Sequence, residues 1–345
     1  MKKVREWSKR KKIIVGTVLS MLILAIGYGT YQYIQLQNTK KVFEAQQKER
    51  MEELQRQQEE QDQAKEGVAT IFHEDRINFL LMGFDKDESR IDKWRLFRPD
   101  ALVMVSLDLK TDGVDMISFP RDALVWIAHR PGKDKINAAF YYGHDLGGGK
   151  TAEEKEAMGY QYVVDTVSEF LGNIYIDNYV AMDMDGFERL IDDMGGVDMY
   201  VERDGYDHAH GGVLYAKEGQ QVLDGYQFLA YIRDRGTDVT QDEDRAQRTQ
   251  KAFQVLYKQL KDQNMLSMLP KLLDNYRENV DTNMTLREMS ALALYAQKMD
   301  MDSMGKHVIK GDYEYREEQI YFIPDEQARI DLVKKVFGYD FTPQR

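Results

Sequence analysis

The sequence contains no cysteine and only six prolines among its 345 residues. The absence of cysteine excludes disulfide bonds, thiol catalysis and zinc sites with cysteine ligands. No proline-rich linker or internal repeat divides the chain after residue 70. The sequence also lacks a G-x-S-x-G elbow and an H-E-x-x-H helix, so it gives no support to serine hydrolases or zinc proteases of these types.

Charged residues are absent from one long apolar run, residues 13–34. This run is long enough to span a bilayer, which takes about 20 mostly apolar residues. Seven basic residues and one acid precede it in residues 2–12, so the positive-inside rule predicts a cytoplasmic N-terminus and an outer remainder. A cleaved signal peptide is the alternative, but no small-residue cleavage site follows the run. We expect an uncleaved, single-pass signal anchor in the cell membrane.

The rest of the chain is strongly acidic. Residues 1–12 carry a net charge of +6, so a total of −12 leaves −18 for the remainder. General nucleic-acid binding needs a broad basic surface, which this composition argues against. A local basic pocket is still compatible with it. We therefore expect the lipid bilayer as a partner and no nucleic acid.

The chain is expected to have four parts. These are a cytoplasmic basic tail (1–12), the membrane anchor (13–34), a polar segment (35–69) and one extracytoplasmic domain (70–345). The polar segment is either a helical stalk or a solvated spacer, and its apolar residues are too sparse to establish a coiled coil. In the domain, predicted strands alternate with predicted helices. This pattern predicts an α/β fold with a mixed central sheet and helices on both faces.

The apolar patterns place the elements of this domain. Strands are expected at 77–84, 101–109, 114–119, 179–182 and 197–201, with a strand pair within 307–323. Helices are expected at 153–171, 185–194, 253–260, 265–277, 286–299 and 326–336.

Charged side chains follow the first predicted strand. Asp85 comes directly after it and Asp100 opens the next, so both carboxylates are expected at one edge of a sheet. The loop between them holds three arginines, Arg90, Arg95 and Arg98. A hard cation such as Mg²⁺ or Mn²⁺ prefers oxygen ligands, and guanidinium groups match phosphate geometry. The pattern favours a cation and phosphate site, with a solvated loop as the competing interpretation. Which of Arg90 and Arg95 faces the site stays open.

Further arginines lie in two other places. Arg121 follows Pro120 at the end of the third predicted strand. A second cluster holds Arg233 and Arg235, two residues apart, and Arg245 and Arg248, three apart. The first pair would share a face of an extended segment, and the second a face of a helix. Neighbouring carboxylates such as Asp242 could pair with these arginines, so surface ion pairs are the competing interpretation.

Two other motifs carry less weight. Residues 147–151 imitate a phosphate-binding P-loop, but the required first glycine is His144, so we expect a flexible loop. His208 and His210 could hold a metal, but glycines flank them, so we expect a surface loop there.

Eight segments occur in an order that resembles the LytR-CpsA-Psr family of bacterial cell-envelope proteins. They are NFLLMGFD (78–85), RPDALVMVSLD (98–108), ISFPRD (117–122), KINAAFYYG (135–143), YVAMDMDGF (179–187), DMGGVDMYV (193–201), LDGYQFLAYIRDR (223–235) and DEDRAQRTQ (242–250). The resemblance covers residues 75–340, and the last 95 residues match only loosely.

The resemblance implies a phosphotransferase of cell-wall biogenesis. Such an enzyme takes an anionic glycopolymer, for example teichoic acid or capsule, from an undecaprenyl-pyrophosphate carrier and attaches it to a muramic-acid hydroxyl of peptidoglycan. By position, the resemblance implies that Asp85 and Asp100 bind Mg²⁺ (or Mn²⁺). It assigns phosphate binding to Arg98, Arg121, Arg233, Arg235, Arg245 and Arg248. It assigns catalysis to Arg121, Arg233, Arg235 and Asp242.

The sequence departs from the family pattern at two positions. Pro99 stands where the family often has serine, and Thr249 separates Arg248 from the glutamine that usually follows it. Two alternatives stay open: a non-catalytic polyprenyl-phosphate-binding or regulatory envelope protein, and a lipid-pyrophosphate hydrolase.

Overall fold

A computed structural model describes most of the domain. The described residues are 41–50, 52, 71, 73, 75–85, 98–207, 211–234, 241–262, 279–296, 298–299, 302–316 and 318–343, with the backbone alone at 241–246. The predicted membrane anchor at 13–34 therefore lies outside them, as does the helix expected at 265–277. Among the helices that are described, none has the length and apolar character needed to cross a membrane.

Strands and helices alternate along the chain. The strands are β1 (Arg76–Phe84), β2 (Pro99–Asp108), β3 (Gly113–Phe119), β4 (Leu124–Trp126), β5 (Lys133–Lys135), β6 (Asn178–Asp183), β7 (Val197–Val201), β8 (Gly205–Asp207), β9 (Val213–Ala216), β10 (Gly219–Leu223), β11 (Val280–Thr282), β12 (Gly305–Val308), β13 (Gly311–Arg316) and β14 (Gln319–Pro324). The helices are α3 (Ala138–Leu146), α4 (Ala152–Phe170), α5 (Met184–Asp193), α6 (Gly225–Arg233), α7 (Gln241–Asp262), α9 (Leu286–Ala296) and α10 (Glu326–Phe337), preceded by an N-terminal helix at residues 41–50.

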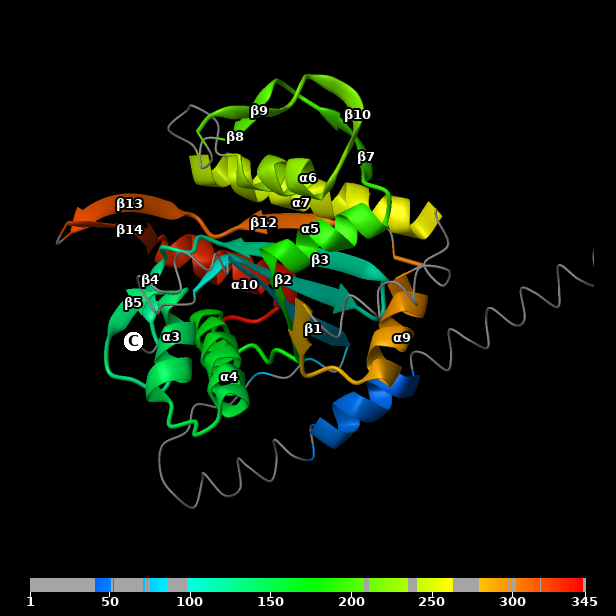
Figure 1. The fold of residues 1–345 in the computed structure, drawn as a ribbon. Coiled ribbons are helices and arrows are strands. Elements are labelled where there is room, and N and C mark those ends of the chain that lie inside the picture. Colours follow the sequence, from blue (N-terminus) through cyan, green and yellow to red (C-terminus); the bar gives the residue numbers. More distant parts are fainter. Residues whose placement is uncertain are drawn as a thin grey trace, which may run out of the picture.

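Six strands form a mixed central sheet in the order β11-β6-β1-β2-β3-β12 (Figure 1). Strands β1, β2 and β3 are antiparallel neighbours, whereas β6 pairs parallel to β1 and β12 pairs parallel to β3. The central strand β1 is a nearly continuous apolar run that is buried on both of its faces. Such a run forms where both faces of a sheet are covered.

Helices cover both faces of this sheet. On one face, α3, α4 and α10 pack on β1–β3 through residues such as Val163, Val167 and Val333, all fully buried. On the other face, α9 and the N-terminal helix pack through Phe43 and Tyr295, also fully buried. The two rings meet edge to face with centroids 6.4 Å apart. The predicted mixed α/β fold with helices on both faces is therefore confirmed.

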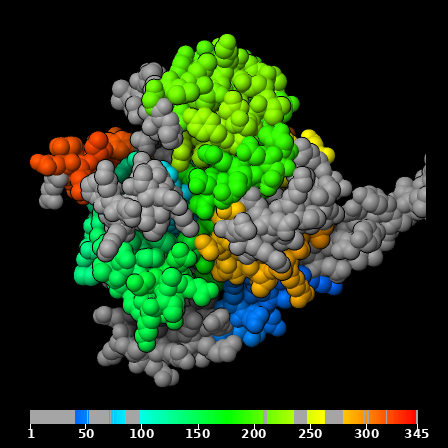
Figure 2. Space-filling model, in the orientation of Figure 1, coloured from blue at the N-terminus to red at the C-terminus, as the bar shows by residue number. Residues whose placement is uncertain are grey.

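A third core lies beside the sheet. Helices α5, α6 and α7 pack with strands β7–β10 around a separate set of buried residues, among them Val197, Leu223 and Phe228. These elements form the lobe at the top of Figures 1 and 2. The lobe places the end of α6 and the side of α7 near the edge of the central sheet where β1 ends.

Local sequence signals fix the helix ends. Thr151 and Glu154 form a reciprocal capping box at the start of α4, so the glycine-rich segment before them ends in a helix cap. Helix α10 begins at the N-cap Asp325 and ends at Gly338, whose φ of 68° lies in the left-handed region that favours glycine. Helices α3 and α4 approach closely because Gly143 has no side chain; a Cβ there would lie 2.2 Å from the carbonyl oxygen of Met158.

The expected strands at 77–84, 101–109 and 114–119 are confirmed as β1, β2 and β3, and the strand pair near the C-terminus as the β13–β14 hairpin. Arg233 is the last residue of helix α6, which Asp224 and Gln227 start with a capping box. The shared face that an extended segment would give Arg233 and Arg235 therefore does not apply at Arg233. The short strands β4, β5 and β8–β11 were not predicted, and β12 starts two residues before the predicted strand pair at 307–323.

Candidate active site

The predicted acidic residues meet at one edge of the sheet. Asp85 follows the last residue of β1, and the register pairs Phe84 with Pro99, which places Asp100 beside it. The β2–β3 pairing sets Leu102 opposite Phe119. Because these strands are antiparallel, the chain that leaves β3 through Arg121 reaches the same edge as the start of β2.

A chain of ion pairs runs along this edge. Arg121 donates to Asp100 at 2.6 Å, and its Nε lies 3.4 Å from Asp122. On its other oxygen Asp122 accepts Lys135 at 2.7 Å. Although burial opposes the shift, Asp100 and Asp122 raise the pKa of the Arg121 guanidinium, so Arg121 remains a cation at any physiological pH. The four side chains are between 16% and 33% exposed, which leaves them accessible to a ligand.

Arg233 adds a second pair at the same edge. Its guanidinium lies 3.4 Å from Asp85 and also contacts the sulfur of Met184, the first residue of α5. Strand β6 ends beside β1, with Asp183 opposite Phe84, so α5 starts at this edge. Three segments that are far apart in the sequence therefore meet here.

Arg248 is held by a different carboxylate. On helix α7, it bonds to the carbonyl oxygen of Asp234 and lies 3.5 Å from its side chain. Asp234 is 8% exposed, and it also accepts the hydroxyl of Tyr215 at 3.0 Å and pairs with Arg203 at 3.3 Å. This buried acid fixes α7 to the end of α6. Asp234, which directly follows Arg233 in the chain, thus holds Arg248 near Arg233.

Arg98 borders the site just before β2. Its Nε is buried and has no hydrogen-bond acceptor among the described residues. A buried donor that lacks a protein acceptor is costly, and an anionic ligand would satisfy it. Within the described part of the edge, four cations (Arg98, Arg121, Lys135 and Arg233) lie among four carboxylates (Asp85, Asp100, Asp122 and Asp183). The edge therefore gathers cations in a strongly acidic domain, and a bound anion can pair with them.

The carboxylates at this edge also fit a magnesium ion. Mg²⁺ is commonly held by one or two protein carboxylates together with water and substrate phosphates. Asp85 and Asp100 supply such a pair from neighbouring strands. Among the described residues no group of three or more His, Asp or Glu side chains could hold a metal alone. The donor set therefore suits an ion that is shared with a phosphate ligand rather than a closed protein cage.

Several predicted site residues lie outside the described part of the chain. They are Arg90, Arg95 and Arg235, together with the side chains of Asp242 and Arg245. Asp85, Asp100, Arg121 and Arg233 are brought together, and Arg248 is placed on Asp234 nearby. The catalytic, phosphate-binding and metal-binding roles of these residues stay predictions.

Sequence reasoning missed Asp122 and Lys135. Both stand in segments that were recognised, but neither received a role. The β4–β5 hairpin pairs Leu124 with Lys135, which returns the lysine to the end of β3. A lysine two residues before a conspicuous Asn-Ala-Ala-Phe run was the available signal, and only the hairpin gives it a partner.

A mixed α/β domain whose sheet edge gathers arginines and carboxylates indicates a protein that binds phosphate groups. The LytR_cpsA_psr family profile matches residues 32–336, and the chain belongs to this family.

Characterised relatives cover most of its length. It is 30% identical over 283 residues to the polyisoprenyl-teichoic acid–peptidoglycan teichoic acid transferase TagU of Halalkalibacterium halodurans, covering 81% of this chain and 82% of that one. It is 27% identical over 343 residues to the corresponding transferase TagT of Bacillus subtilis, covering 98% and 97%. A solved structure of TagT bound to LIIa-WTA superposes with a TM-score of 0.59 at 25% identity, covering 76% of this chain and 90% of that one.

Proposed function

We propose that this protein transfers an anionic glycopolymer, such as wall teichoic acid or capsule, from an undecaprenyl-pyrophosphate carrier to a muramic-acid hydroxyl of peptidoglycan. The observation that carries the proposal is the ion-pair chain Asp100–Arg121–Asp122–Lys135 beside the Asp85–Arg233 pair. Relatives that span nearly the whole chain are teichoic acid transferases, which supports the same reaction here.

The arginines would bind the pyrophosphate. Arg121 and Arg233 are now neutralised by carboxylates, and phosphate oxygens can take over these contacts when the donor enters. Arg98 has a buried donor for a further phosphate oxygen. Phosphoryl transfer depends mainly on positioning and on neutralising charge at the phosphorus, so such a set is sufficient without a covalent nucleophile.

The transfer step exchanges one phosphorus–oxygen bond for another. The acceptor hydroxyl oxygen bonds to the phosphorus next to the glycan, and the bond from that phosphorus to the bridging oxygen breaks. The leaving group is the polyprenyl monophosphate, whose growing charge the arginines stabilise. The hydroxyl proton passes to a base, for which a carboxylate of the site is suited.

Asp85 and Asp100 would hold Mg²⁺ or Mn²⁺ on the pyrophosphate, where the ion would supply charge neutralisation and orientation of the phosphate oxygens. Asp100 also pairs with Arg121, so a residue that would hold the ion lies next to one that would bind phosphate.

The reaction would take place at the outer face of the cell membrane. The apolar run at 13–34 would act as a single-pass anchor with a cytoplasmic N-terminus. A membrane-bound enzyme and a lipid-linked donor then share one surface, so the anchor would hold the site where the carrier's pyrophosphate leaves the bilayer.

One experiment separates this proposal from its alternatives. The full chain in detergent micelles is incubated with Mg²⁺, a lipid-pyrophosphate-linked glycan and peptidoglycan oligomers. Glycan–peptidoglycan conjugate that Arg121→Ala abolishes and Arg287→Ala does not would support transfer; Arg287 is an exposed arginine of helix α9. Release of free glycan phosphate without conjugate would instead identify a hydrolase. Absence of turnover, with tight binding of the lipid, would identify a binding protein.

A further inference from the structure

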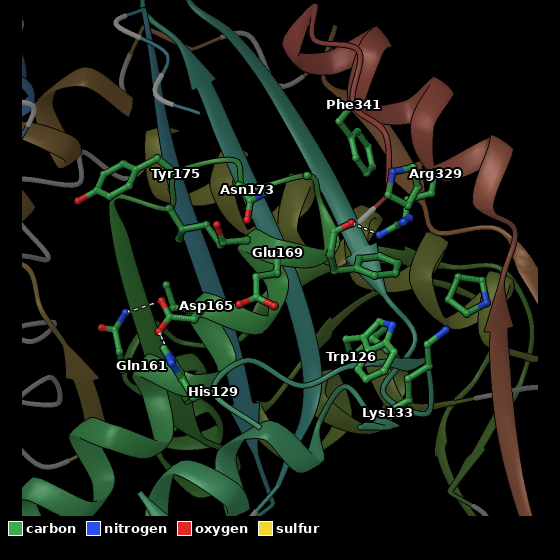
Figure 3. Close-up of a pocket in the computed structure, with 18 of the residues that line it drawn as sticks. Trp126, His129, Lys133, Gln161, Asp165, Glu169, Asn173, Tyr175, Arg329 and Phe341 are labelled. Atoms are coloured by element: carbon green, nitrogen blue, oxygen red, sulfur yellow. Dashed lines mark hydrogen bonds and ion pairs between the residues drawn. The ribbon is translucent and has the colours of Figure 1, made fainter. Parts of the chain in front are cut away.

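A second polar feature lies away from the ion-pair chain. A cavity of about 1030 Å³ opens between the β4–β5 hairpin, the outer side of α4, α10 and the chain after it. Figure 3 shows its walls: Gln161, Asp165 and Glu169 from α4, Trp126 and Lys133 from the hairpin, and Arg329 and Phe341 opposite. Asp85, Asp100, Arg121 and Arg233 are not among its lining residues. The residues assigned above to the transfer reaction do not include this cavity.

The formal charges that line the cavity balance, because four lysine or arginine side chains stand against four aspartate or glutamate side chains, with His129 beside them. A cavity that selected an anion, such as a polyphosphate or a teichoic acid polymer, would show an excess of cations. Its carboxylates, Glu169 foremost, would repel a polyanion. The balance therefore favours an uncharged polar ligand.

The polar groups of the cavity are arranged as donors and acceptors for such a ligand. Asp165 holds the amide of Gln161 at 2.7 Å and His129 at 2.6 Å, so three planar groups share one wall (Figure 3). On the opposite wall Arg329 is 7% exposed, and its Nε has no hydrogen-bond acceptor among the described residues. Asn178, which lines the base, is 1% exposed, and its amide nitrogen likewise has no acceptor among them. Buried polar groups of this kind are satisfied by ligand or water.

Aromatic rings supply the remaining walls. The lining includes Trp126, Tyr175, Tyr339 and Phe341. Tyr339 and Phe341 stack nearly parallel, with centroids 6.4 Å apart and an angle of 10°, and Arg329 lies 5.1 Å from the ring of Phe341. Flat apolar faces next to amides and carboxylates match the alternating apolar and hydroxyl-bearing faces of a sugar ring. A few well-placed polar groups among aromatic walls are typical of small-ligand sites.

The β4–β5 hairpin connects the cavity with the ion-pair chain. Trp126 pairs with Lys133 at the cavity, and two residues along, Leu124 pairs with Lys135, which binds Asp122. Side chains two apart on a strand share a face and lie roughly 7 Å apart. The hairpin thus joins one wall of the cavity to a residue of the ion-pair chain.

We infer that this cavity is a saccharide site, and that it holds an uncharged, N-acetylated stretch of the acceptor glycan while the donor's pyrophosphate lies at the ion-pair chain. That the bound glycan is the acceptor rests on the proposed transfer reaction, whereas the saccharide site itself rests on the cavity alone. The glycan of the donor is the other possible source of sugar. Its negative charge is what the cavity's carboxylates disfavour.

The test uses an oligomer of β-1,4-linked N-acetylglucosamine with the full chain in detergent micelles. Binding is followed by saturation-transfer NMR and calorimetry. Glu169→Arg fills the cavity with a long cation, and because Glu169 is exposed in the last turn of α4, an arginine there suits the helix dipole and leaves the fold intact. Asp331→Arg, an exposed charge reversal on α10 outside the cavity, is the matched control.

We expect the oligomer to bind the wild type and Asp331→Arg equally, and Glu169→Arg at least about tenfold more weakly, as for the loss of one or two hydrogen bonds. In the transfer assay the KM for peptidoglycan oligomers rises by a similar factor, while kcat and the KM for the lipid-linked donor stay the same. Equal binding by Glu169→Arg, or no binding by the wild type, overturns the saccharide site. A rise in the donor's KM alone overturns the acceptor assignment. If turnover is absent but Glu169-dependent binding remains, the transfer proposal fails and the saccharide site stands.

Discussion

Strands β1 and β6 carry arginine–carboxylate pairs at both of their ends, and the two ends differ in how far water reaches the charges. Where β1 and β6 end, the side chains of Asp85 and Arg233 are 24% and 27% exposed. Where β6 begins, the side chain of Asp177 is 4% exposed and faces Arg50 of the N-terminal helix. The same residue types therefore serve in two environments.

The contacts differ as well. At the start of β6, Asp177 accepts the backbone N–H of Asn78 at 2.8 Å, and Arg50 bonds to the backbone oxygen of Asp177 and to Asn178. Two of these three bonds involve main-chain atoms, which are less easily replaced by a ligand than a side-chain carboxylate is, and the third joins Arg50 to the side-chain oxygen of Asn178. At the other end the arginines bind side-chain carboxylates, which a phosphate can displace. An arginine therefore marks a binding site where a ligand can replace the carboxylate that it pairs with. It marks a structural contact where its partners include main-chain atoms.

The largest effect on activity is expected where β1 and β6 end, at the ion pairs that a phosphate can displace. Arg121→Ala should lower the transfer rate by roughly a hundredfold to a thousandfold, as the loss of one charge-stabilising donor does. Its half-exposed side chain contributes little to the core, so the thermal unfolding midpoint should stay near that of the wild type. Rates are compared under saturating donor, with Arg287→Ala as the control. A loss of less than about threefold would mean that the phosphorus lies elsewhere.

Asp85→Asn tests the metal at the same end. The amide keeps the size of the side chain but removes a negative ligand, so the Mg²⁺ concentration for half-maximal activity should rise by about tenfold to a hundredfold. Excess Mg²⁺ should restore part of the rate. Activity is measured across a Mg²⁺ titration after chelation, and Asp331→Asn, exposed on α10, serves as the control. Identical titration curves for the wild type and Asp85→Asn would contradict metal binding by this residue.

The buried end should show itself in pH-dependent stability. Burial raises the pKa of Asp177 to about 7, although the N–H of Asn78 and the charge of Arg50 oppose the shift. The folded state therefore holds a proton that the unfolded state has already lost. This stabilisation is complete below the unfolded pKa and disappears as the pH rises through 7. Between about pH 5 and pH 8 the wild type should lose about 2 kcal/mol of unfolding free energy on this account.

Asp177→Asn removes the titrating group and should flatten that slope. The measurement is urea unfolding of the full chain in detergent, followed by tryptophan fluorescence at each pH. Asp185→Asn on α5 is a control for general charge effects. A slope that persists unchanged in Asp177→Asn would show that another group carries it.

The sequence could predict the elements whose signals are local. Strand β1 is an apolar run, and α4 starts at a capping box; both follow from neighbouring residues. Strand β12 could not be found in this way. It is a short segment that pairs with β3, with His307 opposite Ile117, which lies 190 residues earlier in the chain. Its position is set by packing on a sheet that already exists.

The candidate site divides in the same manner. Asp85, Asp100 and Arg121 were predicted because each directly follows or opens a strong strand, and strand ends meet at sheet edges. The pairing of Lys135 with Asp122 depends on the β4–β5 hairpin, whose strands have three residues each. The pairing of Arg50 with Asp177 spans 127 residues and has no local signal. The N-terminal helix was assigned to a polar segment by composition, and it docks through the buried ring of Phe43 together with bonds from Gln47 and Arg50 to distant parts of the chain.

The smallest expected effect, a pH-dependent loss of stability in Arg50→Ala, tests the comparison of the two ends of β1 and β6 most directly. Arg50→Ala removes the cation that opposes protonation of Asp177, so the pKa of Asp177 should rise further. Near pH 5 the carboxyl is neutral with or without Arg50, and the variant loses only the hydrogen bonds of Arg50 to the backbone oxygen of Asp177 and to the side chain of Asn178. Near pH 8 Asp177 of the wild type is ionised and paired with Arg50. In the variant the buried carboxyl of Asp177 must instead stay protonated, although protons are scarce at this pH. The destabilisation by Arg50→Ala should therefore be about 1 kcal/mol larger at pH 8 than at pH 5.

Lys48→Ala, an exposed change on the same helix, should cost the same at both pH values. The rate of transfer by Arg50→Ala at saturating donor and acceptor, measured where the protein stays folded, should match the wild type, because Arg50 bonds to the main chain of Asp177 and to the side chain of Asn178, away from Arg121. The KM for peptidoglycan is not part of this comparison, since Arg50 also lines the proposed saccharide cavity. A large loss of activity with unchanged stability would reverse the assignment and make the buried end part of the reaction. Equal destabilisation at both pH values would mean that Arg50 holds the helix through its hydrogen bonds alone, and that the charge of Asp177 has no part in the structural contact.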